Sequence, residues 1–146
     1  MKKTKNLFSK GKVNLANYES LILNSRQQCD LELLLNGGFS PLKGFLNKAD
    51  YDSVLKNMRL EDGSLWPIPI TLDAPSSFIE KIKNQDKIIL RDKEGFPLAV
   101  LNISDIWKPD FLLESKLIFG TRDKKHPGVN FLLNKSNENY IGGQII

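Results

Sequence analysis

LELLLNGGFSPLKGFLNKADYDSVLKNMRLEDGSLWPIPITLD, residues 31–73, holds the signals that decide the fold. Its Gly37-Gly38 pair predicts the end of a helix, because glycine readily adopts the left-handed conformation found there. Asn47 predicts the N-cap of a second helix. The apolar stripe of that helix consists of Tyr51, Val54, Leu55 and Met58. The stretch therefore predicts two helices joined by a loop.

The end of the same stretch favours a turn and then a strand. Glu61-Asp62-Gly63 has turn chemistry, and residues 65–72 alternate apolar side chains with prolines. Pro67 and Pro69 cannot donate ladder hydrogen bonds, so an edge or barrel-rim strand is expected.

Outward from this stretch, helices alternate with short strands. Residues 18–35 carry apolar side chains at helical spacing and are expected to form two short helices. The remaining expected elements are a helix at 75–83, strands at 87–91 and 98–106 around a turn at 92–95, a helix capped by Asp110 at 110–118, a helix at 127–133, and a strand at 140–141. The pattern predicts an α+β fold, a small mixed and curled sheet or barrel with peripheral helices.

Length and charge limit the classes of function. The chain has 146 residues, 40% of them hydrophobic and 26% charged, which fits one globular domain. The chain has a net charge of +4, and residues 1–12 alone contribute +5 from five lysines. The other 16 basic and 17 acidic residues therefore sum to −1. We interpret residues 1–12 as a basic flexible tail and residues 13–146 as a single domain. Nucleic acid is therefore not the expected partner.

The cysteine count and the length of the apolar runs indicate the expected cellular compartment. Cys29 is the single cysteine, so an internal disulfide or a multi-cysteine metal site is excluded. Beside the apolar run 31–35 it is expected to be a packed thiol. No apolar run reaches the length of a membrane span or of a signal-peptide core, so a cytoplasmic protein without a membrane partner is expected.

Three further segments contribute to a family resemblance: KIILRDKEGFPLAVLNISDIWKPD at 87–110, FGTRDKKHPGV at 119–129 and YIGG at 140–143. Together with residues 31–73 they resemble the amino-terminal domain of the ATP sulfurylase (sulfate adenylyltransferase) family. The resemblance covers roughly residues 30–143. It implies a PUA-like barrel as the fold of this domain.

The resemblance also implies where the chemistry lies. The family joins sulfate to the α-phosphate of ATP, and its catalytic motifs, of the types Q-x-R-N and H-x-G-H, belong to the following domain. His126 is the single histidine of this chain, and no glutamine here is followed by Arg and Asn at the required spacing. The chain is thus expected to be an accessory domain, inactive on its own, with no catalytic, cofactor-binding or metal-binding residues.

The same resemblance implies the partners. The expected partner is the catalytic domain, in cis or in trans, and MgATP is expected only in the full enzyme. A homo-oligomer and a polypeptide continuing past Ile146 both stay open. Many relatives carry a Pro-His-Gly-Gly-type segment where residues 8–12 read FSKGK, so no role of that histidine is transferred.

Several residues were weighed as sites in their own right. Gly37-Gly38 with Ser40 and Lys43 lacks the order of a phosphate-binding P-loop. His126 with Asp123 could form an anion-contacting pocket, but a capping turn is favoured. The remaining candidates are read as surface or packing residues: Asp50 with Asp52, Glu61 with Asp62, Arg91 with Asp92, and the two tryptophans, Trp66 and Trp107. A free-standing RNA-binding module and a regulatory partner acting in trans are the alternatives.

Overall fold

A computed structural model describes residues 15–134 and 136–146. The predicted basic tail, residues 1–12, lies outside the described residues. The elements, in order, are a short 3-10 helix Leu15–Asn17, β1 Ser20–Ile22, α1 Ser25–Asn36, β2 Gly44–Phe45, α2 Lys48–Asn57, β3 Leu72–Ala74, α3 Ser76–Lys81, β4 Lys87–Arg91, β5 Pro97–Trp107, α4 Phe111–Phe119, α5 Pro127–Asn134 and β6 Asn139–Ile145.

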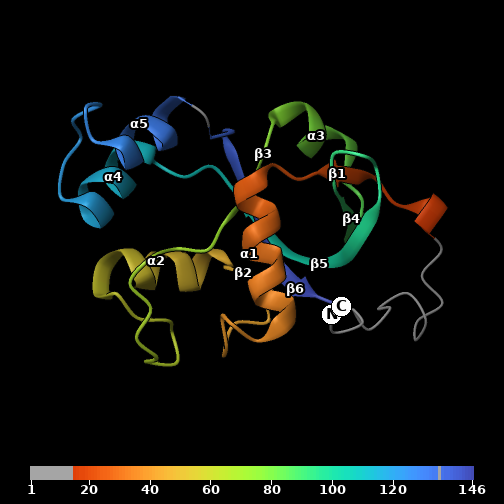
Figure 1. Cartoon of the computed structure of the whole chain (residues 1–146), viewed down its shortest axis with the longest axis horizontal. Coiled ribbons are helices and arrows are strands. Elements are labelled where there is room, and N and C mark those ends of the chain that lie inside the picture. The colour runs from red at the N-terminus through yellow and green to blue at the C-terminus, as the bar shows by residue number, and fades with distance from the viewer. Residues whose placement is uncertain (1–14, 135) are drawn as a thin grey trace.

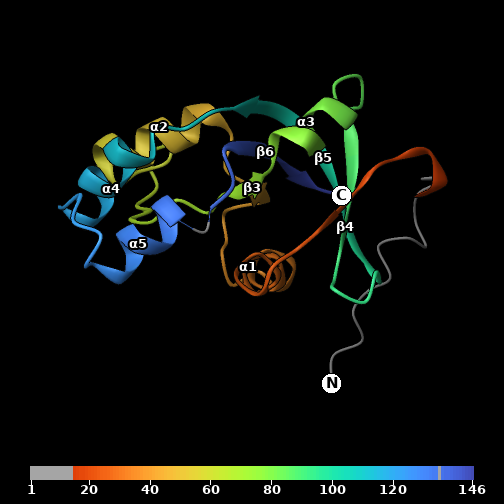
Figure 2. The same ribbon diagram turned by 90° about the horizontal axis from the view of Figure 1, so that it is seen from above.

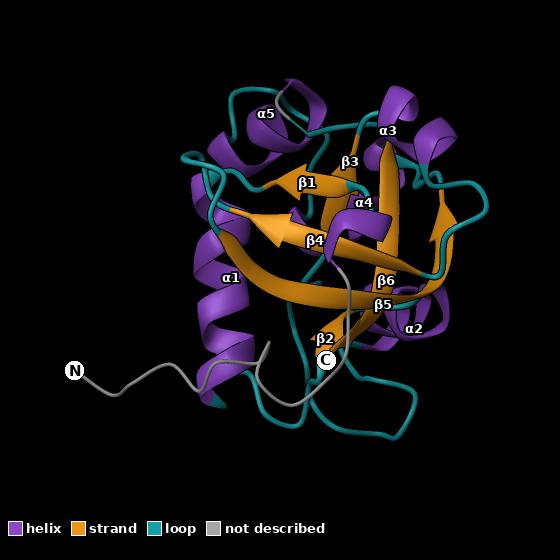
Figure 3. Cartoon of the chain, turned by 90° about the vertical axis from the view of Figure 1, so that its right-hand side faces the viewer, coloured by secondary structure: helices purple, strands orange, loops and turns teal. Residues whose placement is uncertain are grey.

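The strands form one mixed sheet with the order β1-β4-β5-β6-β2, in which β3 also pairs with β6. Only the β1–β4 pair is parallel among these pairings. β5 is long and strongly curved, and it bends the sheet around the core (Figure 3). A register shift between Ile103 and Asp105 contributes a bulge to this strand. The expected curled, mixed sheet with peripheral helices is confirmed.

β6 lies inside the sheet, with strands paired along both of its edges, and glycines allow these strands to approach it closely. It pairs with β5 along one edge, and with β3 and β2 in turn along the other. A Cβ at Gly44 of β2 would lie 1.9 Å from the carbonyl oxygen of Gly143. A Cβ at Gly143 would lie 2.2 Å from the Asn102 carbonyl oxygen. Glycine is therefore required where β6 is packed closely between its neighbours.

Two apolar clusters hold the layers together. The larger contains core residues of β1, α1, α3, β4 and β5 within the curl of the sheet. The smaller joins α2 to β6 and consists of Leu46, Tyr51, Val54, Leu55, Leu60 and Tyr140. Helices α2, α4 and α5 lie together at one end of the molecule, whereas the β4–β5 hairpin lies at the other (Figures 1 and 2).

The local capping signals of the sequence are confirmed. Gly37 ends α1 with φ of 84°. The Asn47 side chain accepts a hydrogen bond from the Asp50 amide at 2.8 Å, and Asp110 accepts from the first amides of α4 at 3.1 Å. Both are N-caps that satisfy amides with no partner inside the helix. Gly63 has φ of 92°, in agreement with the predicted turn.

The prediction of a helix at the start of residues 18–35 was wrong. Ser20–Ile22 forms β1 and pairs in parallel with β4, in the register Ser20 to Ile89 and Ile22 to Arg91. Leu21 and Ile22 are two adjacent apolar residues, which fit a strand as well as a helix. Their spacing therefore does not distinguish the two. The partner strand, far along the chain, decides it.

The predicted strand at 65–72 was also wrong. Leu65 makes an isolated bridge to Arg59, and regular pairing begins only at Leu72. Pro67 and Pro69 supply no amide donors, so this segment crosses the fold without a ladder. Ile70 is buried and its carbonyl accepts from the Leu46 amide at 2.9 Å.

The stripe of α2 is shorter than predicted. Tyr51, Val54 and Leu55 are buried, but Met58 is 54% exposed and has a left-handed backbone with φ of 53°. It caps the helix instead of extending its apolar face. Within the described residues no helix is long and apolar enough to cross a membrane.

Candidate functional site

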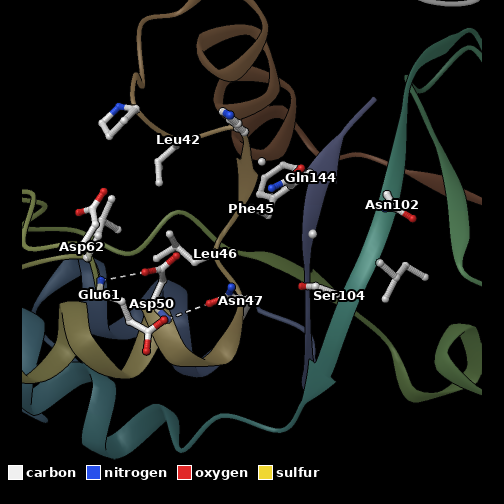
Figure 4. Close-up of a pocket in the computed structure, with 16 residues that line it drawn as sticks. Leu42, Phe45, Leu46, Asn47, Asp50, Glu61, Asp62, Asn102, Ser104 and Gln144 are labelled. Atoms are coloured by element: carbon white, nitrogen blue, oxygen red, sulfur yellow. Dashed lines mark hydrogen bonds between the residues drawn. The ribbon is translucent and has the colours of Figure 1, made fainter.

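A pocket of about 630 Å³ opens between the sheet and the start of α2 (Figure 4). Asn102 and Ser104 of β5 and Gln144 of β6 form its sheet side. The opposite side is formed by the start of α2 and the following turn, with Asp50, Glu61 and Asp62. The pocket is therefore bounded by amides on one side and carboxylates on the other.

The acidic side of this pocket is fixed by backbone hydrogen bonds. Asp50 accepts from the Glu61 amide at 2.9 Å and Asp62 accepts from the Ser64 amide at 2.8 Å. The hydrogen bond from Ser64 lowers the pKa of the Asp62 carboxyl. Asp105, at the bulge of β5, accepts from the Lys48 amide at 3.0 Å and so ties the sheet to α2. These carboxylates organise turns and a helix start.

A second pocket, of about 200 Å³, lies under α4 and α5. Its floor is polar and its rim apolar. Asp73 of β3 is 3% exposed and receives four hydrogen bonds, two on each oxygen. Their donors are Arg26 and Gln27 of α1 and the Asn137 backbone and side-chain amides. The carboxylate is thus a buried junction of α1, β3 and the segment before β6.

Glu114 of α4 is the second buried acid of this floor, at 5% exposure. Its Oε1 accepts from the hydroxyl groups of Tyr51 at 2.5 Å and Tyr140 at 2.9 Å. Burial raises the pKa of the Glu114 carboxyl, and the two tyrosine hydrogen bonds oppose this. Burial and the adjacent carboxyl raise the pKa values of Tyr51 and Tyr140, so both remain donors.

His126 lies where a capping turn places it. Its backbone amide donates to the Asp123 carbonyl at 3.0 Å, and its Nδ1 accepts from the Gly128 amide at 3.1 Å. The ring packs on Phe119 with centroids 4.9 Å apart. The side chain is exposed and organises the entry to α5.

The tryptophans pack, as expected, against apolar and aromatic residues. Trp66 meets Phe39 edge-on at 5.6 Å. Trp107 contacts Tyr51 and Tyr140 with ring centroids 5.5 and 5.7 Å apart, and its buried Nε1 has no partner among the described residues. The expectation for Cys29 was wrong, since this thiol is exposed on α1. Of the apolar run beside Cys29, Leu31 lies on the buried face of α1. Cys29 lies off that face.

The other candidate pairs have structural partners. Asp52 pairs with Lys48 at 2.8 Å on the surface of α2. Arg91 donates to Ser20 Oγ at 2.7 Å, and Asp92 accepts from the amides of the hairpin turn. Over the described ranges, no group of three or more His, Cys, Asp or Glu side chains could hold a metal ion.

Sequence reasoning missed the buried polar floor of the second pocket. Asp73 was inside the decisive stretch and Glu114 inside an expected helix, yet neither was singled out. The available signal was position, since both acids stand among apolar neighbours, in ITLDA and FLLESKLI. An acid at an apolar position indicates a buried, paired carboxylate.

The described part of the chain is thus a curled, mixed sheet with one pocket at its side and a second pocket under two helices. A family model described as a PUA-like domain matches residues 3–146. The chain belongs to the PUA-like domain family. The PUA-like architecture expected from the sequence is confirmed.

The curated relatives confirm the resemblance to ATP sulfurylase. Sulfate adenylyltransferase from Neosartorya fischeri is 50% identical over 129 residues, covering 86% of this chain and 22% of that protein. Sulfate adenylyltransferases from Kluyveromyces lactis and Saccharomyces cerevisiae are 47% and 46% identical, each covering 84% of this chain and 24% of the relative. The chain therefore spans about a quarter of the length of the relatives it matches.

A solved structure agrees. A hexameric APS kinase from Thiobacillus denitrificans superposes with a TM-score of 0.64 and 32% sequence identity, covering 89% of this chain and 21% of that protein. This chain is thus similar to about a fifth to a quarter of the length of these longer proteins.

Proposed function

We propose that this chain is the amino-terminal accessory domain of a sulfate adenylyltransferase, which forms adenosine 5′-phosphosulfate and pyrophosphate from ATP and sulfate. In this proposal the chain packs against a catalytic domain, in cis or in trans, and that domain binds MgATP. The complex acts in the cytoplasm, and a homo-oligomer is part of the proposal.

The observation that carries the proposal is the high identity within a short span. Identity of 46–50% extends over 84–86% of this chain but reaches only 22–24% of each relative. The carboxylates Asp73 and Glu114 are engaged in hydrogen bonds that join elements of the fold. Both carboxylates therefore serve to hold the fold together.

A chimeric enzyme tests the proposal. The matching 123 residues of the Saccharomyces cerevisiae enzyme are replaced by the segment of this chain that aligns with them, and sulfate-dependent pyrophosphate release from MgATP is measured. We expect the chimera to be active and the 146-residue chain alone to be inactive. An inactive but folded chimera, or an active isolated chain, would contradict the proposal.

The alternatives in cis and in trans differ in polypeptide length. The intact mass of the gene product from its source cells separates them, because this chain has a mass of 16.6 kDa. A much larger mass indicates a continuous enzyme. A mass near 16.6 kDa that copurifies with a separate sulfurylase subunit indicates association in trans.

A further inference from the structure

Helices α4 and α5 form a unit, residues 111–134, that is inserted between two strands paired to each other. β5 ends at Trp107 and β6 begins at Asn139, and Trp107 lies opposite Tyr140 in the β5–β6 ladder. The chain therefore leaves the sheet and returns to it at neighbouring points. Figures 1 and 2 show both helices together at one end of the molecule. The α4–α5 unit can thus move without breaking any pair of this ladder.

The interior of the α4–α5 unit is separate from the two apolar clusters of the domain. Val129 and Leu132 of α5 are buried, but neither belongs to the larger or to the smaller cluster. Phe111 and Ile118 of α4 pack against the smaller cluster and are only partly buried. Among the described residues, no fully buried side chain of the unit therefore lies in either cluster.

The polarity of α4 is the reverse of that of an ordinary surface helix. Its buried residues are Glu114 and Ser115. Three of its leucines are exposed instead, by 48%, 44% and 40%: Leu112, Leu113 and Leu117. Glu114 joins α4 to α2 and β6, because its Oε1 accepts from the hydroxyl groups of Tyr51 and Tyr140. The docking of α4 thus depends on a carboxyl group that has been removed from water.

The pocket of about 200 Å³ lies at the boundary between this unit and the sheet. Arg26, Thr71 and Asp73 line it from the side of α1 and the sheet, and Glu114 and Leu132 line it from the side of the unit. A cavity here means that the boundary lacks part of the packing contacts that a solid interior would have.

The ionisable groups that face Glu114 come from four elements: Arg26 of α1, Tyr51 of α2, Asp73 of β3 and Tyr140 of β6. Helix α5 carries no ionisable side chain, and Lys116, the other ionisable residue of α4, is exposed. Burial raises the pKa of the Glu114 carboxyl, and the hydrogen bonds from the two tyrosines and the charge of Arg26 oppose this, whereas Asp73 adds to it. Because burial raises the pKa values of both tyrosines, they stay neutral donors.

We propose that the α4–α5 unit opens from the sheet as one body, and that the ionisation of Glu114 controls how often it opens. With a proton on Glu114 the unit stays closed over the pocket. After the proton is lost, opening returns the carboxylate to water, while Tyr51 and Tyr140 stay with α2 and the sheet. This inference concerns the domain itself and goes beyond the proposed function.

The direction of the pH dependence follows from the two states of the unit. In the closed state the pKa of Glu114 is raised, and in the open state it returns toward its ordinary value. The closed state therefore binds the proton more tightly than the open state. Opening becomes more frequent as pH rises from the ordinary value through the raised one.

Hydrogen–deuterium exchange of the 146-residue chain between pH 4 and pH 8, corrected for the intrinsic exchange rate of each amide, tests the inference. We expect the protection factors of amides in α4 and α5 to fall together, by up to about tenfold per pH unit, while Glu114 loses its proton. Amides of β4 and β5 should keep higher protection at every pH. Equal protection in α4, α5, β4 and β5 would mean that the unit opens only when the whole domain unfolds, and would overturn the inference.

Two acid-to-amide variants identify the controlling group. Glu114→Gln keeps the Oε1 acceptor but cannot ionise, so protection in α4 and α5 should no longer change with pH. Glu80→Gln removes an exposed acid of α3 and should behave as the parent chain does. A pH dependence that survives in Glu114→Gln would show that another group controls the opening, and would also overturn the proposal.

Tyr140→Phe tests the same control without changing the carboxyl group. It removes one of the two donors to Glu114. A hydrogen bond to the carboxylate favours its charged form, so the loss raises the pKa of Glu114 further in the closed state. We expect the fall in protection of α4 and α5 to extend to higher pH in this variant. A fall over the same pH range as in the parent would contradict the role of Glu114.

Discussion

Asp73 is the residue on which most of the buried polar network converges. Its carboxylate joins α1 to β3 through Arg26 and Gln27, and reaches the start of β6 through Asn137. Replacing it with alanine removes all four of these hydrogen bonds in a buried site, and it leaves the two Asn137 amides without the acceptor that they share. Arg26 keeps Asp30 and the Thr71 carbonyl as acceptors. We expect Asp73→Ala to lower the free energy of unfolding by roughly 3–5 kcal/mol in urea denaturation.

The matched control is another aspartate in an ion pair. Asp52 pairs with Lys48 at 2.8 Å, but the two side chains are 43% and 54% exposed. Asp52→Ala should change the free energy of unfolding by less than about 1 kcal/mol. Equal losses in the two variants would show that burial of the Asp73 network does not matter.

Glu114 makes the stability of the domain depend on pH. Burial raises its pKa in the folded state above the unfolded value, so the folded state binds more protons in that range. This group's contribution is fully present below the unfolded pKa and is lost as pH rises through the folded pKa. Glu114→Gln removes the titration, so the variant should gain stability relative to the parent as pH rises above the unfolded value of about 4.3.

Urea midpoints of both proteins between pH 4 and pH 8 measure this difference. Other titrating groups are common to both chains and cancel. A difference that stays constant, or that favours the parent as pH rises, would contradict a raised pKa for Glu114.

At the scale of elements, helix starts depend on single side chains. The Asn47 side chain accepts from the Asp50 amide at 2.8 Å at the start of α2, which carries three core residues. We expect Asn47→Ala to lower the free energy of unfolding by about 1 kcal/mol, because an amide loses its partner. Asn57→Ala, at the exposed end of the same helix, should be neutral or slightly stabilising. Thermal unfolding of both variants decides whether the cap or mere helix composition matters.

Strands behave differently from helices in this chain. The helices at α2, α3, α4 and α5 follow from caps and spacing within about ten residues. β1 was mispredicted because a strand is defined by its partner, and its partner β4 is distant in the sequence. The segment 65–72 was mispredicted because its prolines have no N–H group to pair with a neighbouring strand. The expected strand at 140–141 is seven residues long and central, which its two glycines concealed.

At the scale of the whole molecule, the charge distribution argues against nucleic-acid binding. Residues 13–146 carry 16 basic and 17 acidic side chains, so this part of the sequence has no cationic excess. We expect residues 13–146 to show no tight, salt-sensitive binding to single-stranded RNA in a filter-binding titration. Tight binding with a steep salt dependence after deletion of residues 1–12 would revive the RNA-binding module.

The sequence by itself determined the α+β class, the caps at Asn47, Asp110 and Gly37, the β4–β5 hairpin and the family resemblance. These features are encoded by neighbouring residues, whose conformational preferences act over one or two turns of chain. Spacing and turn chemistry therefore sufficed for them.

Only the tertiary structure decided that Asp73 and Glu114 are buried, that Arg26 and the two tyrosines meet them, and that Cys29 faces solvent. The buried contacts join segments far apart in the sequence, as in the bonds to Glu114 from Tyr140 and Tyr51, 26 and 63 residues away. Burial is a property of the packed whole. A local pattern such as ITLDA marks an acid as a candidate for burial, but only the packed fold supplies the donors that make its burial tolerable.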